Sequence, residues 1–235
     1  MRNVNSCRCN EVGASMHKKT MISRIIPRES VQDISSQVLQ EDGKLRLFPS
    51  KKWRDFEWND FRAFCHDKAR YGIPTYELHL MIHAIINGRD CIEIGAGAGD
   101  FGHHLRIHMT DSRQQEMPYV KAAYEAMHQP VIQYPDDVEK LDAIDAIQKY
   151  EPKVVFASWI TPYSPIETYY KSNPFGVRVN KVVELVDTFI LYGNLDTHGD
   201  MPIMKLPHDE IYDDWMVSRG KNQENNRLWI WNKKR

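Results

Sequence analysis

Three glycines at alternate positions, directly after a short apolar segment, are the feature that most constrains how this chain can fold. Cys91 to Ile94 is followed by Gly95, Gly97 and Gly99. A short apolar run that ends at glycine predicts a buried β-strand. Glycine also lets the backbone adopt positive φ and lets a ligand approach it closely. Since open α/β sheets bind ligands at the carboxyl ends of their strands, we expect a sheet of this kind with a ligand site at this turn.

The chain around this turn alternates short apolar segments with amphipathic ones. We predict strands at Cys91–Ile94, Arg106–Thr110, Val131–Tyr134, Lys153–Ser158, Thr188–Tyr192 and Leu228–Trp231. We predict helices at Asp100–Leu105, Met117–His128, Val138–Lys149 and Val179–Val186, the first of them less than two turns long. Strands that alternate with helices indicate a parallel sheet covered on both faces.

The residues before this sheet divide into two parts. Residues 1–44 are polar with a mild basic bias, and we expect a partly mobile extension with a short helix at Ser30–Leu39. Residues 45–89 are predicted to form a helical cover, with Trp53, Phe56, Phe61 and Phe64 on one helical stripe. A second helix of the cover follows Pro74, with Thr75 as its N-cap. Residues 45–235 are thus expected to form one α/β domain, with the sheet core in 90–235.

Composition disfavours several classes of protein. The 31 Lys and Arg residues against 32 Asp and Glu give a net charge of −1, so no global basic field attracts nucleic acid, although a local basic patch stays possible. The four cysteines do not suggest a disulfide framework in a chain of 235 residues; they suggest free thiols in a reducing compartment. No apolar run reaches the roughly 18 residues that a membrane helix needs, and we see no secretory signal. We therefore expect a cytoplasmic protein.

Acidic residues follow three successive predicted strands. Glu93 lies beside the glycines and provides an acceptor for an ammonium or a hydroxyl group. Asp111 follows the second strand, where a carboxylate can accept hydrogen bonds from both ribose hydroxyls. Asp136 and Asp137 follow the predicted third strand and are placed to accept from an adenine amino group. This set suits a cationic ligand that carries a nucleoside better than it suits a pyrophosphate.

The stretch Glu93–Gly99 resembles the first motif, E-x-G-x-G-x-G, of the class I S-adenosylmethionine-dependent methyltransferases. The resemblance covers about residues 75–235 and implies a doubly wound, mostly parallel, seven-stranded Rossmann-like sheet whose last strand is antiparallel. It implies S-adenosylmethionine as methyl donor, with Asp111 at the ribose. The resemblance also implies cofactor contacts at Glu93, Gly95, Ala96, Gly97 and Gly99, at Asp136, Asp137 and Val138 beside the adenine, and at Ser158 after the fourth strand.

The implied function is methyl transfer to an acceptor that the sequence does not identify, a small molecule or a protein side chain in preference to duplex DNA. The main task of such an enzyme is alignment of the reactants and exclusion of water, so an acid–base pair is not required. Weak candidates for the reactive centre are Trp159 and Tyr163, which can stack on a planar acceptor, and His198 as a base. Residues 158–163 loosely resemble the N/D-P-P-Y motif of amino-group methyltransferases, of which only Pro162 and Tyr163 match.

Other interpretations of the same residues stay open. Gly97 to Gly102 also fits the dinucleotide pattern G-x-G-x-x-G, although Asp111 then follows too early for the acid of that pattern, so a nicotinamide-dependent oxidoreductase is one alternative. A non-catalytic nucleotide-binding or interaction module is another. The segment Tyr71–Thr75 can form a lid or a simple connection. We predict no metal site from two groups of histidines: His79 and His83, and His103, His104 and His108.

Overall fold

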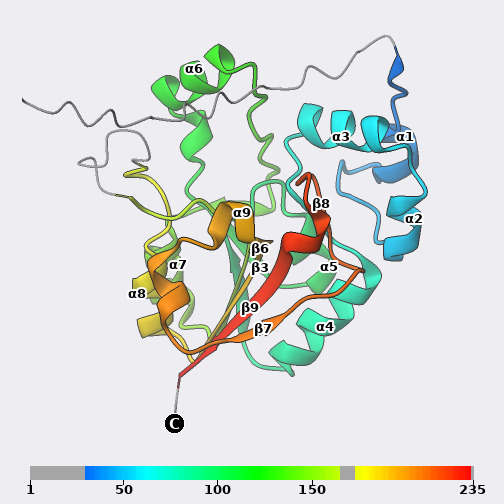
Figure 1. Ribbon diagram of the computed structural model, residues 1–235. Helices are drawn as coiled ribbons and strands as arrows, with labels where there is room; N and C mark the ends of the chain where they lie inside the picture. Colours follow the sequence, from blue (N-terminus) through cyan, green and yellow to red (C-terminus); the bar gives the residue numbers. More distant parts are fainter. Residues whose placement is uncertain (1–29, 165–172, 234–235) are drawn as a thin grey trace, which may run out of the picture.

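A mixed seven-stranded sheet forms the centre of the molecule in the computed structural model, which describes residues 30–164 and 173–233 (Figure 1). The strands of this sheet are β2 (Cys91–Ile94), β3 (His108–Asp111), β4 (Val138–Lys140), β5 (Val154–Ser158), β6 (Thr188–Asn194), β7 (Asp209–Ile211) and β9 (Asn226–Asn232). Two further strands, β1 (Gly72–Ile73) and β8 (Val217–Ser218), lie outside it. The α-helices are α1 (Ser35–Val38), α2 (Ser50–Arg54), α3 (Trp58–Asp67), α4 (Tyr76–Ile86), α5 (Asp100–Leu105), α6 (Pro118–Ala126), α7 (Ala143–Tyr150), α8 (Val179–Leu185) and α9 (Leu195–His198).

The strand order across the sheet is β4-β3-β2-β5-β6-β9-β7. The five strands from β4 to β6 are parallel to one another, and β9 pairs antiparallel with both β6 and β7. The order runs outward in both directions from β2, so the sheet is doubly wound. The predicted fold class is therefore confirmed. The prediction of an antiparallel last strand is also confirmed, since β9 runs antiparallel to β6.

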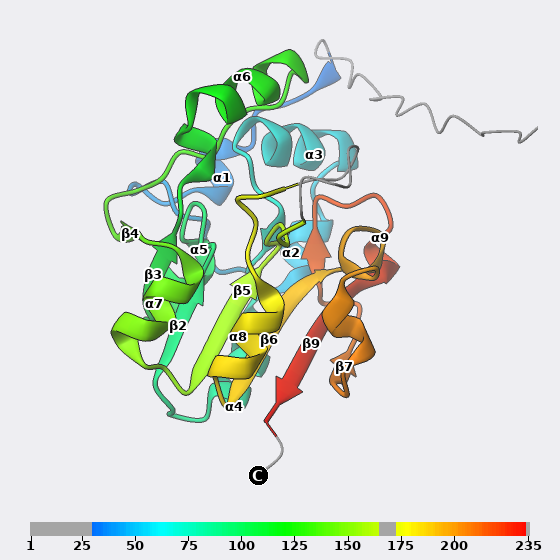
Figure 2. The same cartoon turned by 90° about the vertical axis from the view of Figure 1, so that its left-hand side faces the viewer.

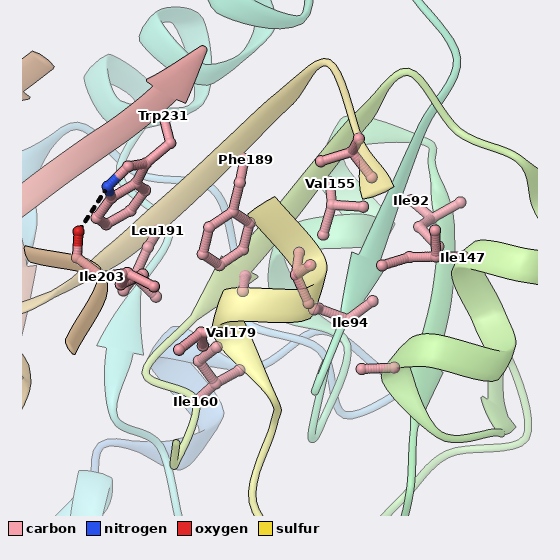
Figure 3. Packing of buried hydrophobic residues seen from close by; sticks show 14 of the residues in the cluster. Ile92, Ile94, Ile147, Val155, Ile160, Val179, Phe189, Leu191, Ile203 and Trp231 are labelled. Atoms are coloured by element: carbon pink, nitrogen blue, oxygen red, sulfur yellow. Dashed lines mark hydrogen bonds between the residues drawn. The ribbon is translucent and has the colours of Figure 1, made fainter. Parts of the chain in front are cut away.

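Helices cover both faces of this sheet, α4 and α5 on one face and α7 and α8 on the other (Figures 1 and 2). Successive residues of β5 alternate between the two layers: Val154 and Phe156 pack with α4 and α5, while Val155 and Ala157 pack with α7 and α8. Burial on both faces explains why the sequence of this strand shows no polar alternation. Figure 3 shows the layer that contains α7 and α8. In this layer the Trp231 indole donates a hydrogen bond to the Ile203 carbonyl at 3.1 Å.

The carboxyl ends of the parallel strands all lie at one edge of the sheet. Because β9 runs down to the C-terminal end in Figure 1 and pairs antiparallel with β6, the parallel strands run upward. Above this edge lie α6 and the N-terminal helices α1 and α3, in both views (Figures 1 and 2). These elements therefore lie on the same side of the sheet as the carboxyl ends of its parallel strands.

The cover is built around Trp53, which is 1% exposed and packs with Phe61 and Phe64. The predicted single aromatic stripe is divided between α2 and α3, because the chain turns at Phe56 and Glu57 before α3 begins. The N-cap prediction is confirmed, since the Thr75 hydroxyl accepts a hydrogen bond from the Leu78 amide at 3.2 Å. The short helix expected near residues 30–39 is only one turn, α1.

Two predicted elements after α6 are wrong. Residues 131–134 form no strand, and the Ile132 amide instead donates to the Gln115 side chain at 2.8 Å. The third parallel strand is β4, whose Val138 pairs with Met109, so the helix predicted from Val138 begins only at Ala143. A three-residue strand with one buried apolar residue has too little pattern to be distinguished from the helix that follows. The edge strand β7 was not predicted either.

The described parts of the chain contain no helix with both the length and the apolar character needed to cross a bilayer. Cys65 and Cys91 are free cysteines, whereas Cys7 and Cys9 lie outside the described residues. The expected cellular location and the expected partial mobility of the extension over residues 1–44 stay predictions.

Candidate active site

The glycine turn after β2 adopts a conformation that favours glycine at each of its three positions. Gly95, Gly97 and Gly99 have φ values of +60°, +57° and +74°, a region that costs other residues roughly 1–2 kcal/mol. A Cβ atom on Gly97 would lie 3.4 Å from Ile132 Cδ1. The absent side chain of Gly97 therefore leaves space between the turn and the Ile132 side chain.

That space belongs to a cleft at the carboxyl edge of the sheet. Its volume is about 160 Å³, roughly ten times what one water molecule requires. Its walls come from the glycine turn, from residues 111–115, from Asp142 and Ala143, and from residues 158–161. Residues 69–72 of the cover and Tyr124 of α6 complete it. The cleft is thus at the position where doubly wound sheets bind their ligands.

Asp111 connects the end of β3 to the glycine turn. One carboxylate oxygen accepts from the Gly97 amide at 2.9 Å, and the other accepts from the Arg113 amide at 2.7 Å. Burial raises the pKa of Asp111, while these amide hydrogen bonds and the Arg113 charge oppose the rise. The Tyr134 side chain also hydrogen-bonds this carboxylate. Since a carboxylate has about four lone-pair sites, Asp111 keeps one to accept a hydrogen bond from a ligand.

Asp142 is a residue that the sequence interpretation missed. It follows β4, the real third parallel strand, and it lines the same cleft as Asp111. One of its oxygens caps α7 by accepting from the Ile144 amide at 2.9 Å, which leaves the other oxygen available for a ligand. An Asp immediately before an amphipathic helix is a recognisable N-cap signal that could have located it.

The two acids expected at this position lie elsewhere. Asp136 and Asp137 precede β4 instead of following it, are exposed, and do not line the cleft. Asp137 pairs with Lys44 of the N-terminal segment at 2.9 Å. Val138, expected beside the adenine, is fully buried within the sheet and also lies outside the cleft lining. The error follows directly from the misplaced third strand.

Glu93 lies beneath the glycine turn and is 1% exposed. Its carboxylate accepts a hydrogen bond from the Gly102 amide at 2.7 Å. Burial raises the pKa of Glu93 to about 8, an effect that this hydrogen bond reduces. Near neutral pH the side chain is therefore mostly protonated, so it offers a ligand a neutral hydrogen-bonding group rather than a full negative charge.

The remaining predicted cofactor residues divide between the cleft and the core. Gly95, Ala96 and Ser158 line the cleft. Gly99 does not: a Cβ on it would lie 2.6 Å from Lys44 Nζ and 2.9 Å from Met109 Sδ, so its close neighbours are behind the turn.

Trp159 stands at the far end of the cleft from Asp142, directly after β5. Its backbone has a φ of +53°, which is unusual for a bulky residue, and its ring centroid is 6.3 Å from that of Tyr71. Gly72 permits this packing, because a Cβ there would lie 2.8 Å from both the Trp159 ring and the Ser158 hydroxyl. The predicted cover loop thus contributes an aromatic wall through Tyr71, beside the end of β5.

Two candidates for the reactive centre are not part of this cleft. Tyr163 is 37% exposed, and the Arg178 guanidinium lies over its ring. His198 is 0% exposed, its two ring nitrogens lie within hydrogen-bond distance of the Asn194 backbone and the Ile160 carbonyl, and burial lowers its pKa. His198 therefore packs as a core histidine and is not positioned to take a proton from an acceptor in the cleft.

The histidine groups show no metal-binding geometry. His79 and His83 pack with their ring centroids 6.2 Å apart, and His108 contacts Glu139 at 2.9 Å. Within residues 30–164 and 173–233, no group of three or more His, Cys, Asp or Glu side chains is arranged to hold a metal ion.

No protein-family model matches the chain, and no curated protein sequence matches it. In three dimensions, however, the chain is similar to solved methyltransferase structures. Precorrin-6y C5,15-methyltransferase from Geobacter metallireducens GS-15 is 13% identical over 69% of this chain and 90% of that one, with a TM-score of 0.34.

The CurJ carbon methyltransferase is 12% identical over 78% of this chain and 57% of that one, with a TM-score of 0.36. Similarity at this level concerns the arrangement of the fold alone. The assignment of the site therefore depends on the residues of this chain.

Proposed function

We propose that the protein transfers a methyl group from S-adenosylmethionine to an acceptor bound in the same cleft. The observation that supports the proposal most strongly is the convergence of three neighbouring parallel strands on this cleft. The turn after β2 contributes glycines, β3 ends in Asp111, and Asp142 follows β4. Both acids also have structural roles, Asp111 at the turn and Asp142 as the cap of α7, but both line the cleft and keep acceptor capacity for a ligand.

The residues present fit this cofactor. The space left by Gly97 is suited to the narrow amino-acid half, because a side chain there would approach Ile132. Asp111 has a lone pair left for a ribose hydroxyl after accepting from the Gly97 and Arg113 amides and from Tyr134. Asp142 has a second oxygen to accept from the adenine amino group. We therefore assign the adenine role to Asp142 in place of Asp136 or Asp137.

When bound, S-adenosylmethionine supplies an electrophilic methyl group on a positively charged sulfur. The residues of the chain have to orient it and keep water away, which is the larger part of catalysis for a displacement of this kind. Trp159 provides an aromatic face in the cleft, which attracts a cation through its π electrons. The ring of Tyr71 already has the Arg219 guanidinium over it, 3.6 Å from the ring centre. Burial raises the pKa of Glu93 to about 8, so near pH 7 its side chain is mostly neutral and adds little negative charge below the turn.

The acceptor is proposed to bind beside Trp159, in the cleft that Tyr71 and Tyr124 also line. The side chains of these two tyrosines hydrogen-bond each other. Tyr124 of α6 lines this end of the cleft, and burial raises its pKa to about 12, so its hydroxyl stays protonated at neutral pH. Since His198 is enclosed in the core, the acceptor needs to be nucleophilic without its help. A small molecule or a protein side chain stays the proposed acceptor class.

We expect Asp142→Ser to weaken the binding of S-adenosylhomocysteine, the cofactor product, by about ten-fold, the loss typical of a hydrogen bond to a charged group. Serine also caps helices, so α7 should stay intact. The affinity for S-inosylhomocysteine, which lacks the adenine amino group, should change within about two-fold. Calorimetric titration of both ligands measures the difference.

Asp136→Ser is the matched control, because Asp136 is exposed and lies outside the cleft. Its affinity for S-adenosylhomocysteine should equal that of the wild type. If Asp136→Ser weakens binding and Asp142→Ser does not, the adenine role belongs to the residue before β4, and our assignment is wrong.

A further inference from the structure

We propose that Lys44 is a positioning residue for the cofactor site, which makes the N-terminal segment part of the functional unit. Lys44 lies in the turn after α1, at the end of the stretch that the sequence suggested was an extension. Its side chain is nevertheless almost fully buried, with 4% exposed. Burial of a lysine is costly unless its charge is paired and its donors are used. The inference rests on the proposed function.

Lys44 binds the glycine turn from behind. Its Nζ atom donates to the Ala98 carbonyl at 3.0 Å and to Asp137 at 2.9 Å. A Cβ atom on Gly99 would lie only 2.6 Å from Lys44 Nζ. One ammonium group thus connects three segments distant in sequence: the turn after α1, the glycine turn, and the turn before β4.

Neighbouring contacts fix this lysine in place. The Leu45 amide donates to Asp100, the first residue of α5, at 2.8 Å, and the Leu45 carbonyl lies 2.7 Å from His104 Nε2. Arg70 donates to the Gly43 carbonyl at 2.9 Å and pairs with the other oxygen of Asp100 at 2.8 Å. The backbone on both sides of Lys44 is therefore anchored to α5 and to the cover, so its ammonium group is held against the turn.

This arrangement gives Lys44 an effect on one half of the cofactor in particular. Lys44 contacts the turn at Ala98, the residue directly after Gly97, whose space is proposed to hold the amino-acid half. The groups proposed for the nucleoside half, Asp111 and Asp142, come from β3 and from the segment after β4. Loss of the Lys44 contact should consequently weaken binding of the homocysteine portion and leave binding of the nucleoside unchanged.

The test is calorimetric titration of Lys44→Met with S-adenosylhomocysteine and with 5′-methylthioadenosine, which lacks the amino-acid group. We expect the affinity for S-adenosylhomocysteine to fall about ten-fold, corresponding to one charge-assisted hydrogen bond, and the affinity for 5′-methylthioadenosine to change within about two-fold. Lys51→Met is the matched control, because Lys51 also pairs with an aspartate at 2.9 Å but is 83% exposed. Its affinities should equal those of the wild type.

Asp137→Asn provides a second variant in case Lys44→Met fails to fold. Asp137 is 47% exposed, so its substitution leaves the core intact while removing the negative charge that pairs with Lys44. We expect a smaller loss of S-adenosylhomocysteine affinity in the same direction. Unchanged affinity in both variants, or an equal loss for both ligands, overturns the inference. A wild-type protein that binds neither ligand contradicts the proposed function instead.

Discussion

We expect Gly97→Val to reduce the affinity for S-adenosylhomocysteine by about 10- to 100-fold, since overpacking typically costs about 1–3 kcal/mol. The physical reason is the short approach between the turn and Ile132. Even a bare Cβ at position 97 would lie 3.4 Å from Ile132 Cδ1, and the two methyl groups of valine would extend further into the cleft. The measurement is calorimetric titration of the purified variant, with its melting temperature recorded in parallel.

Gly88→Val separates this steric effect from backbone strain. Gly88 has a φ of +68°, in the same left-handed region as Gly97, yet a Cβ there would meet nothing within 4 Å. Both variants should lose roughly 1–2 kcal/mol of stability from the unfavourable φ, but only Gly97→Val should lose ligand affinity. If Gly97→Val folds and binds S-adenosylhomocysteine as tightly as the wild type, the cofactor does not pass along this turn.

Asp111→Asn should weaken S-adenosylhomocysteine binding by about 10- to 100-fold, equivalent to about 1–3 kcal/mol for a buried polar group left without its partner. Both carboxylate oxygens of Asp111 accept backbone amides, one from Gly97 and one from Arg113. Asparagine has one oxygen and one NH₂ group, so its NH₂ must face one of these amide donors. The glycine turn then loses its anchor or the ribose loses its acceptor.

The pKa of Asp111 gives this variant a second readout. Because burial raises that pKa in the folded protein, ionisation of Asp111 opposes folding as the pH rises above the usual range of an aspartate. Asp111→Asn removes that contribution, so its melting temperature should fall less than that of the wild type between pH 4 and 7. Asp136→Asn should behave like the wild type in both measurements. An Asp111→Asn protein with wild-type ligand affinity would show that the ribose acid lies elsewhere.

The sequence predicted the parts of the site that depend on local geometry. The Gly95–Gly99 turn, the short helix Asp100–Leu105 and the Thr75 cap each follow from residue types whose conformational demands are strong. Burial on both faces of β5 was visible as an apolar run without alternation. In these cases the local preference of the chain and the tertiary structure agree, which is why the prediction holds.

The third strand could not be predicted because its signal is tertiary. Only Val138 of β4 is fully buried, and the strand is defined by its pairing with Met109 and the residues after it. The segment 131–134 looks more like a strand, but it lies between Pro130 and Pro135, where the Ile132 amide bonds to Gln115. Because this strand was misplaced, the sequence analysis expected the adenine acid at Asp136 and Asp137, whereas Asp142 is the acid that follows β4 and lines the cleft.

The role of Lys44 was hidden for a related reason. A lone lysine in a polar segment is usually solvent-exposed, and nothing nearby in sequence shows that its partners are Ala98 and Asp137. These partners are more than fifty residues away along the chain. Long-range polar contacts of this kind become visible only when the fold brings the segments together.

Calorimetric titration of the wild-type protein with S-adenosylhomocysteine, and separately with NADH, tests the central claim most directly. We expect saturable one-to-one binding of S-adenosylhomocysteine with a dissociation constant on the order of micromolar, and no heat of binding with NADH. Binding of NADH alone, or binding of neither ligand by a folded protein, would contradict the assignment of the cleft to S-adenosylmethionine.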